Sequence, residues 1–323
     1  MRSMIGCAFS VGIMTMIGCL PVKIGRINPY DPRNTNIIVS GNNWTQKATG
    51  SFAGRGFGSI VEFNGNMWLI GGSAPYVNDV YRSSDGITWY QATSSLWASG
   101  RYGCASAVFN GKIWVTAGYD GVNKGDVYSS SDGTNWTQET TSPGFSARNA
   151  HQMLVYNGKM WLIGGGAGGA LNDVYYTSDG LTWTSATASA AFSARWAHSA
   201  VVYNDRMWII GGWTGVAALN DMWYSTNGIT WTSAGTFPGG NRYYCSSTLV
   251  GGKIWLIGGQ SSSSVSFASN DVWYYNGSWN YATLNAGFSR RSGSYVSGFM
   301  NKLWVIGGQR YDNAYLTDTW CSD

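Results

Sequence analysis

Short apolar and alternating runs, separated by glycine-containing turns, follow one another along most of the chain. In one such unit a run at 59–63 is followed by Asn64-Gly65 and a second apolar run at 67–70. Asn-Gly between two such runs is the strongest short hairpin signal, because both residues tolerate positive φ. Two further runs, around Val80-Tyr81 and Thr88-Trp89, complete the unit. The pattern predicts four short antiparallel strands per unit and an all-β fold.

The unit recurs six times when the chain is aligned on a tryptophan of the second predicted strand. These tryptophans are 46, 47, 47, 47 and 49 residues apart: Trp68, Trp114, Trp161, Trp208, Trp255 and Trp304. An arginine lies 13 residues before each of them: Arg55, Arg101, Arg148, Arg195, Arg242 and Arg291. Two glycines follow at +3 and +4 in every copy except the second, which has Ala117-Gly118. A fixed period of this length indicates a repeat architecture.

The third and fourth strands of the unit carry their own markers. An aspartate recurs on the third strand at Asp79, Asp126, Asp173, Asp221, Asp271 and Asp318, with an aromatic residue two positions later. A second tryptophan follows at Trp89, Trp136, Trp183, Trp231 and Trp279, but the sixth copy ends before reaching it. Asn43-Trp44-Thr45-Gln46 supplies the missing piece at the other end of the chain. We therefore expect a strand near 44–47 to complete the last unit and close a ring.

Composition fits this picture and excludes several classes of function. Of 323 residues, 45 are glycine, 18 tryptophan and 20 tyrosine, so the chain has ample surface to bury and is not expected to be disordered. Lys and Arg exceed Asp and Glu by 20 to 16, without basic runs, and nucleic acid is not an expected partner. Nothing in the repeats calls for self-association, and we expect a monomer.

The first 18 residues have the layout of a secretory signal peptide. Arg2 precedes an uncharged, mostly apolar stretch that is short for a membrane span. Its end, Met16-Ile17-Gly18-Cys19, resembles a bacterial lipobox, although such boxes usually have leucine where Met16 stands. That resemblance implies export, cleavage before Cys19 and a lipid-bearing N-terminus, with residues 19–40 as a polar tether. Plain secretion and an uncleaved anchor are the alternatives. The remaining cysteines, Cys104, Cys245 and Cys321, are odd in number, and we expect no disulfide between Cys104 and Cys245.

With its double glycine, aromatic residue and closing tryptophan, the unit resembles the kelch repeat. Six in-phase copies imply a six-bladed β-propeller of four-stranded antiparallel blades over residues 41–323. The Ser83-to-Trp89 segment also resembles, one residue short, the Asp-box turn of sialidases and other exported propellers. In those families the box is a folding element, so it implies no catalysis here.

The repeats account for most residues that could carry chemistry. We expect each repeated arginine to pair with an aspartate or cap loop carbonyls, against the alternative of an arginine-lined mouth that binds an anion. Cys104, His151, His198 and Cys245 share one repeat position, but four consecutive blades spread them too widely for one zinc ion. No paired acids, nucleophile elbow or phosphate loop stands out, so we assign no catalytic residue, no metal site and no cofactor. Galactose oxidase, a kelch-type enzyme, needs copper ligands that two repeat-bound histidines do not supply.

Function is therefore expected on the loop face, in residues that break the sixfold pattern. Trp97, Trp196 and Trp213 have no apparent repeat role, and Tyr102 and Tyr243 follow repeat arginines. Aromatic faces beside arginine suit sugar stacking or a protein partner. The candidate ligand-binding residues are Trp97, Arg101, Tyr102, Arg195, Trp196, Trp213, Arg242 and Tyr243. We expect a lipid-anchored module that binds glycan or protein; a mutarotase-like or sialidase-like carbohydrate-active enzyme and a purely structural surface protein are the alternatives.

Overall fold

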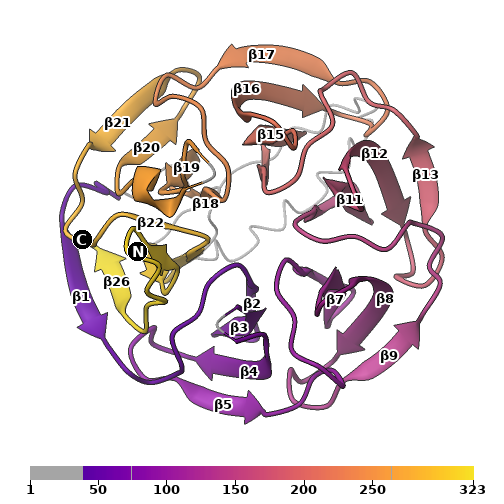
Figure 1. Ribbon diagram of the computed structural model, residues 1–323, viewed down its shortest axis with the longest axis horizontal. Helices are drawn as coiled ribbons and strands as arrows, with labels where there is room; N and C mark the ends of the chain where they lie inside the picture. The colour runs from indigo at the N-terminus through magenta and orange to yellow at the C-terminus, as the bar shows by residue number, and fades with distance from the viewer. Residues whose placement is uncertain (1–38, 74, 263) are drawn as a thin grey trace, which may run out of the picture.

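The computed structural model describes residues 39–73, 75–262 and 264–323, and these form a ring of six four-stranded antiparallel sheets (Figure 1). The signal peptide, Cys19 and nearly all of the tether lie outside the described residues. In five blades the first strand in sequence is innermost and successive strands pair outward in chain order, whereas in the sixth the N-terminal strand takes the outermost place. Six blades, four strands each and an all-β fold confirm the architecture expected from the repeats.

The first three blades have the same strand order. Blade 1 comprises β2 (Ser59–Phe63), β3 (Asn66–Gly72), β4 (Val77–Ser83) and β5 (Tyr90–Thr93). Blade 2 comprises β6 (Ala105–Phe109), β7 (Lys112–Tyr119), β8 (Asn123–Ser130) and β9 (Thr137–Thr140). Blade 3 comprises β10 (Gln152–Tyr156), β11 (Lys159–Gly166), β12 (Ala170–Thr177) and β13 (Thr184–Thr187).

The last three blades differ mainly in their loops. Blade 4 comprises β14 (Ser199–Tyr203), β15 (Arg206–Trp213), β16 (Ala218–Ser225) and β17 (Thr232–Thr236). Blade 5 comprises β18 (Ser246–Val250), β19 (Lys253–Ile257), β20 (Val272–Tyr275) and β21 (Trp279–Thr283), with the 3-10 turn η1 (Val265–Phe267) between β19 and β20. Blade 6 comprises β23 (Tyr295–Phe299), β24 (Lys302–Ile306), β26 (Thr319–Ser322) and the N-terminal β1 (Trp44–Ala48). The short strands β22 (Arg291–Ser292) and β25 (Gln309–Arg310) pair separately.

The ring is closed by the N-terminal strand, as the sequence predicts. β1 pairs antiparallel with β26, with Trp44 opposite Ser322 and Gln46 opposite Trp320. Trp44 also packs edge-on against Phe288, with ring centroids 5.0 Å apart. The last blade is thus assembled from both ends of the described chain and has four strands like the other five.

The core lies between blades, where the repeated tryptophans pack. Each second-strand tryptophan donates its indole N–H to the carbonyl oxygen five residues earlier, as Trp161 does to Tyr156 at 3.0 Å. Except for Trp208, the ring lies against a glycine of the next blade around the ring: a Cβ on Gly228 would stand 2.0 Å from Trp161 Cζ3. A tryptophan that spans the junction and a glycine that makes room for it are therefore two parts of one repeated contact.

In blades 1 to 4 the fourth strand begins just after the repeat tryptophan, which was predicted to belong to the strand. Trp89 precedes β5 (Tyr90–Thr93), because the preceding turn satisfies its own backbone groups. Asp85 Oδ1 accepts hydrogen bonds from the backbone N–H groups of Ile87 and Thr88, both at 2.8 Å. These groups are therefore occupied by the turn and do not join the strand ladder. Among the described residues, no helix is long and apolar enough to cross a membrane.

Candidate functional site

All six repeated arginines form ion pairs with the aspartate of their own blade. Both terminal nitrogens of Arg195, whose side chain is fully buried, donate to the carboxylate of Asp221 at 2.6 and 2.8 Å. Arg195 Nη1, which makes the 2.6 Å bond to Asp221, also donates to the carbonyl of Gly211 at 2.9 Å. The six pairs are Arg55–Asp79, Arg101–Asp126, Arg148–Asp173, Arg195–Asp221, Arg242–Asp271 and Arg291–Asp318. Arg101, Arg195 and Arg242, proposed from the sequence as ligand-binding residues, are thus buried and engaged within the fold.

The paired glycines after each tryptophan make room for this arrangement. Gly211 has φ of +61°, and a Cβ there would stand 2.4 Å from the carbonyl oxygen of Arg242 in the next blade. In blade 2 Ala117 adopts the same left-handed conformation, with φ of +55°. The glycine pair is therefore a packing requirement and does not form a phosphate-binding loop.

Trp97 has a repeat role that the sequence alignment missed. It is only 3% exposed, and the Arg101 guanidinium carbon lies 5.0 Å from its ring centre. In the other blades a phenylalanine takes this place; Arg195 lies 5.4 Å from the ring of Phe192. Four of these phenylalanines stand three residues before their arginine, whereas Trp97 stands four before Arg101, which hid the equivalence. Trp97 belongs to a blade junction and does not reach the loop face.

A closed circle of backbone hydrogen bonds surrounds the propeller axis at the loop face. The residue two positions after each repeat arginine donates its N–H to the carbonyl of its counterpart in the preceding blade, at N···O distances of 2.6–3.0 Å. The six residues are Phe57, Gly103, Ala150, Ala197, Tyr244 and Gly293. All have positive φ, including the bulky Phe57 and Tyr244. Such a conformation costs about 1–2 kcal/mol for a residue other than glycine and therefore needs support from its surroundings.

Phe57 and Tyr244 meet across this circle. Their rings lie edge to face with centroids 4.5 Å apart, although they come from blades 1 and 5. Trp196 packs on Tyr244 from the adjoining blade, at 5.7 Å between centroids. An aromatic surface therefore covers the centre of the loop face. Phe57 and Tyr244 were not predicted from the sequence, although both break the repeat pattern: the other four blades have glycine or alanine at this position.

Cross-strand pairs give the loop face an alternation of large and small residues. The residue after each arginine bridges to the residue five positions after the tryptophan. In blade 2 this pair is Tyr102–Tyr119 and in blade 4 it is Trp196–Trp213, whereas between them blade 3 has Asn149–Gly166. The aromatic pairs of blades 2 and 4 therefore stand on either side of blade 3, whose pair has small side chains.

The hollow over blade 3, here called the blade 3 groove, has a volume of about 370 Å³. Its residues are Tyr102, Asn149, Gly166, Gly168, Gly169, Ala170, Trp196, Thr214, Gly215 and Tyr244. Tyr102 and Trp196 contribute from the two flanking blades, and glycine and alanine of blade 3 leave the space between them open. The structure therefore brings together Tyr102 and Trp196 of the predicted residues and adds Tyr244.

Trp213 and Tyr243 support this groove from behind. Trp213 packs on Tyr243 with ring centroids 4.8 Å apart, and Tyr243 in turn lies 5.8 Å from Trp196. Tyr243 is buried, donates its hydroxyl to the carbonyl of Ser262 and accepts a hydrogen bond from Gln260. These two residues fix the position of Trp196 and do not line the groove themselves.

A second hollow, here called the blade 1 pocket, adjoins the groove. It has a volume of about 270 Å³ and is lined by Phe57, Ser73, Tyr76, Tyr102, Tyr244 and Tyr315. Burial raises the pKa of both Tyr102 and Tyr244, so their hydroxyls stay protonated and neutral. Within the described residues neither hydroxyl has a hydrogen-bond partner.

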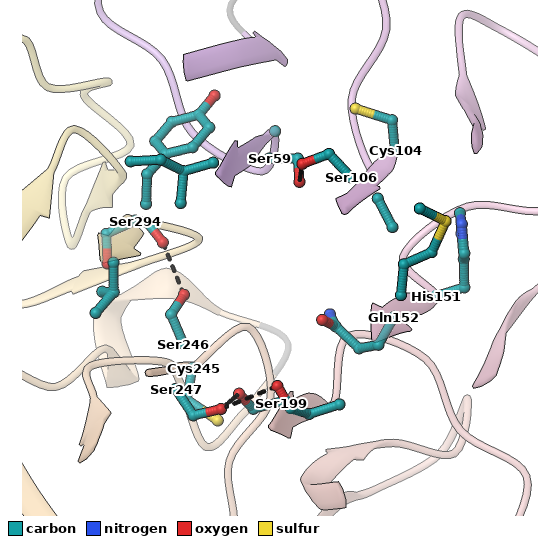
Figure 2. Close-up of a pocket in the computed structure, with 17 residues that line it drawn as sticks. Ser59, Cys104, Ser106, His151, Gln152, Ser199, Cys245, Ser246, Ser247 and Ser294 are labelled. Carbon is teal, nitrogen blue, oxygen red and sulfur yellow. Dashed lines mark hydrogen bonds between the residues drawn. The ribbon is translucent and has the colours of Figure 1, made fainter. Parts of the chain in front are cut away.

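The central channel beneath the backbone circle is lined mainly by small polar side chains (Figure 2). Ser59 and Ser106 hydroxyls lie 2.5 Å apart, and Ser199 donates to Ser247 at 2.6 Å. The labelled serines and Gln152 surround the opening, whereas His151 lies farther out (Figure 2). These four hydroxyls hydrogen-bond in pairs, and the lining of the channel is uncharged.

The shared Cys and His position holds buried, uncharged groups. Burial raises the pKa of Cys104 to about 12 and that of Cys245 to about 11, and lowers the pKa of His198 to about 3. His151 Nε2 is 2.8 Å from the hydroxyl of Thr116, whereas the residue facing His198 at the same place in blade 3 is Ile163. Cys104, Cys245 and Cys321 are free thiols. In the described part of the chain no three His, Cys, Asp or Glu side chains are grouped so as to hold a metal ion.

Comparison with known proteins agrees with the fold. No curated protein matches the sequence. Among matching solved structures, one titled "Structure of YjhT" superposes with a TM-score of 0.68 over 83% of this chain and 94% of the other, at 14% identity. At that identity the likeness extends to the fold alone. Residues 241–283 match the Kelch motif model. The match covers one of the six repeated units, and together with the closed ring of six blades it supports a kelch-repeat β-propeller.

Proposed function

We propose that this chain is a carbohydrate-binding module of the cell surface and that the blade 3 groove is its binding site. The kelch propeller fold is typical of interaction modules. The observation that carries the proposal is the groove itself, where Tyr102 and Trp196 flank a floor of glycine, alanine and asparagine. Blades that are alike in the core and unlike on the loop face support recognition over a purely structural role.

The groove has the chemistry that a sugar requires. Sugar rings present C–H faces that pack on aromatic rings, and their hydroxyls need a few well-placed polar partners. Asn149 donates its amide N–H to Asn123 at 2.5 Å, which leaves its own amide oxygen to accept from a ligand. The Tyr102 and Tyr244 hydroxyls supply donors. A sugar in the groove would thus find both stacking surfaces and hydrogen-bond partners.

A glycan array tests this proposal directly. Residues 20–323 are screened beside Trp196→Ala, which removes one side of the groove, and Tyr90→Ala, an exposed aromatic on the outer strand β5. We expect wild type and Tyr90→Ala to retain the same glycans and Trp196→Ala to lose them, with all three melting cooperatively. A well-folded wild type that retains no glycan contradicts the proposal.

A protein partner is the second candidate, favoured by exposed apolar loop tips. Val216 is 87% exposed, Phe267 60% and Tyr311 52%, on the loops of blades 4, 5 and 6. Such residues form protein-binding anchors when they cluster on one face. Changing Val216 and Phe267 to aspartate should abolish binding of a protein partner and leave glycan binding unchanged.

A carbohydrate-active enzyme has less support. Such an enzyme needs an acid or base beside the bound sugar, and the residues lining the groove and the blade 1 pocket include no Asp, Glu, His or Lys. Incubating any retained glycan with the protein and analysing it by mass spectrometry checks this point, and an altered glycan would favour the enzyme.

Export and lipid anchoring at Cys19 complete the proposal. They rest on the charged start, the apolar stretch and the Met16-Ile17-Gly18-Cys19 end of the leader. Lipid on Cys19 would place the propeller at a membrane, with 19–40 as its tether. Expression in a bacterial host followed by mass spectrometry should show a lipid-bearing N-terminal Cys19. In Cys19→Ala the protein should lack lipid and leave the membrane fraction.

A further inference from the structure

The blade 3 groove and the blade 1 pocket share two residues, Tyr102 and Tyr244. Both hollows therefore open onto the same pair of aromatic rings near the centre of the loop face. We propose that the ligand is a neutral oligosaccharide of at least two sugar units, with one unit in the groove and the next in the pocket. This inference rests on the proposed carbohydrate-binding function and specifies the length and charge of the ligand.

The backbone circle directs the ligand across the face. Six peptide groups hydrogen-bond in a closed loop around the axis, and Phe57 meets Tyr244 over it. A chain that leaves the groove at Tyr244 therefore continues over these rings toward blade 1, because the circle and its aromatic cover narrow the entrance to the channel. The blade 1 pocket is the adjoining space in that direction.

The blade 1 pocket has its own means of holding a second unit. Tyr76 packs on Tyr102, with ring centroids 5.4 Å apart, and on Tyr119 at 6.1 Å. Opposite them Tyr315 contacts Phe57 and its hydroxyl lies 3.1 Å from that of Ser73. Aromatic rings with hydroxyls at their edges thus recur here, as in the groove.

The lining selects a neutral ligand. None of the side chains that line the two hollows carries a charge. The repeat arginines are buried against their aspartates, and the loop charges Lys124 and Asp120 pair with each other at 2.9 Å. A carboxylate or sulfate placed in the hollows would lose hydration without gaining a counter-ion, which is unfavourable. Sialylated and uronic-acid chains should therefore bind less well than neutral chains of equal length.

Calorimetry with defined oligomers tests length and charge together. The probes are glucose, N-acetylglucosamine and galactose oligomers of one to four units, with galacturonate oligomers as acidic counterparts. For the neutral series that binds, we expect affinity to rise at least tenfold from one unit to two or three and then level off. Galacturonate oligomers should bind at least tenfold more weakly than galactose oligomers of the same length.

Variants of the lining residues test where each of the two sugar units binds. Trp196→Ala, in the groove, should weaken binding of every length. Tyr76→Ala, in the pocket, should weaken binding of chains of two or more units more than binding of a single unit, and Tyr315→Ala provides an independent check of the same pocket. Tyr90→Ala again serves as the control.

The outcomes separate this inference from the function on which it rests. Affinity that does not depend on length, or a pocket variant that weakens single sugars as much as longer chains, overturns the two-unit site. A preference for galacturonate overturns the neutral ligand. In each case carbohydrate binding itself survives. Failure of every probe and of the glycan array overturns the proposed function as well.

Discussion

Buried arginines occupy the same place in all six blades, and each depends on one carboxylate. Arg148 is fully buried and both terminal nitrogens donate to Asp173, at 2.6 and 2.8 Å. The charge of a guanidinium in such a place is tolerated because the aspartate and nearby carbonyls surround it. Removing the carboxylate would leave a buried charge without a partner.

Asp173→Ala should therefore destabilise the protein by about 3–5 kcal/mol, as expected for breaking a buried pair. Asp312→Ala, which breaks the exposed pair between Arg310 and Asp312, is the matched control and should change stability little. Thermal and urea unfolding of both variants give the comparison. Equal melting temperatures for the two variants would show that the repeated pairs contribute no more than a surface contact.

Glu62 is the residue whose titration should affect stability near neutral pH. Its side chain lies between the innermost strands β2 and β23, where Ser297 donates to it at 3.0 Å. Partial desolvation by the surrounding protein raises the pKa of Glu62 to about 7, although water still reaches the side chain. The folded state thus holds this proton more tightly than the unfolded state, whose carboxyl group titrates near 4.5. The stability gained is present below about pH 4.5 and is lost as the pH rises through about 7.

Glu62→Gln should accordingly raise the melting temperature more at pH 8 than at pH 5. Glu139→Gln, which removes a carboxylate on the outer strand β9 (Thr137–Thr140), controls for the loss of one negative charge. Melting curves across pH 4–9 supply the measurement. A gain for Glu62→Gln that is the same at both pH values would count against the raised pKa.

At the scale of the element, side chains of the turn between the third and fourth strands accept hydrogen bonds from its backbone, as Ser130 does from Gly133 at 2.7 Å. Asp132 Oδ1 accepts from the backbone N–H groups of Thr134 and Asn135, both at 2.8 Å. These hydrogen bonds hold the pKa of Asp132 well below its usual range. In blade 4 Asn227 makes the equivalent bonds at 2.9 Å, so an amide oxygen serves as well as a carboxylate.

Asp132→Ala should lower stability at pH 7 by roughly 1 kcal/mol, because two backbone donors lose their acceptor. Asp132→Asn should retain most of that stability. The contribution of the charged form is present above about pH 3.8 and falls as the pH drops toward the lowered pKa, so the deficit of the alanine variant should shrink in acid. Urea unfolding at pH 7 and pH 3 measures both effects, and an alanine variant as stable as wild type would contradict them.

Element boundaries show how far the sequence pattern reaches. The Asn-Gly turns of blades 1 to 3 and the apolar runs of all six located the first two strands, because those signals act within a few residues. The start of the fourth strand at Tyr90 instead of Thr88 was not predictable from alternation, since the side chain of Asp85 competes for the backbone donors. Trp97 was misassigned for a similar reason: one extra loop residue shifted it from the position that Phe52 holds in blade 1.

On the scale of the whole molecule, stability depends on a strand that comes from the far end of the described chain. β1 covers the edge of β26 and places Trp44 against Phe288. Without β1, the backbone groups of β26 that now pair with it would be left free to pair with another chain.

A variant that begins at residue 50 should therefore melt well below one that begins at residue 39, and should associate. The second variant retains β1 and serves as the control. Differential scanning calorimetry and size-exclusion chromatography with light scattering compare the two. A monomeric variant of unchanged stability would show that β1 is dispensable for ring closure.

The sequence by itself determined the repeat, the number of blades and the strand order, and it offered the pairing of each arginine with an aspartate as one of the alternatives. These depend on spacing within one unit of about 47 residues, and six copies make each signal unmistakable. It also singled out Tyr102 and Trp196, which the structure places on the lining of the blade 3 groove.

Only the tertiary structure decided how the blades combine. Phe57 and Tyr244 are far apart in the chain, yet their rings meet because ring closure brings blades 1 and 5 to one centre. The hollow over blade 3 exists because blades 2 and 4, which carry the aromatic pairs, are its neighbours around the axis. The burial of Arg195 and Tyr243 depends on neighbours from other strands. Contacts between distant segments create the groove, and no local pattern encodes such contacts.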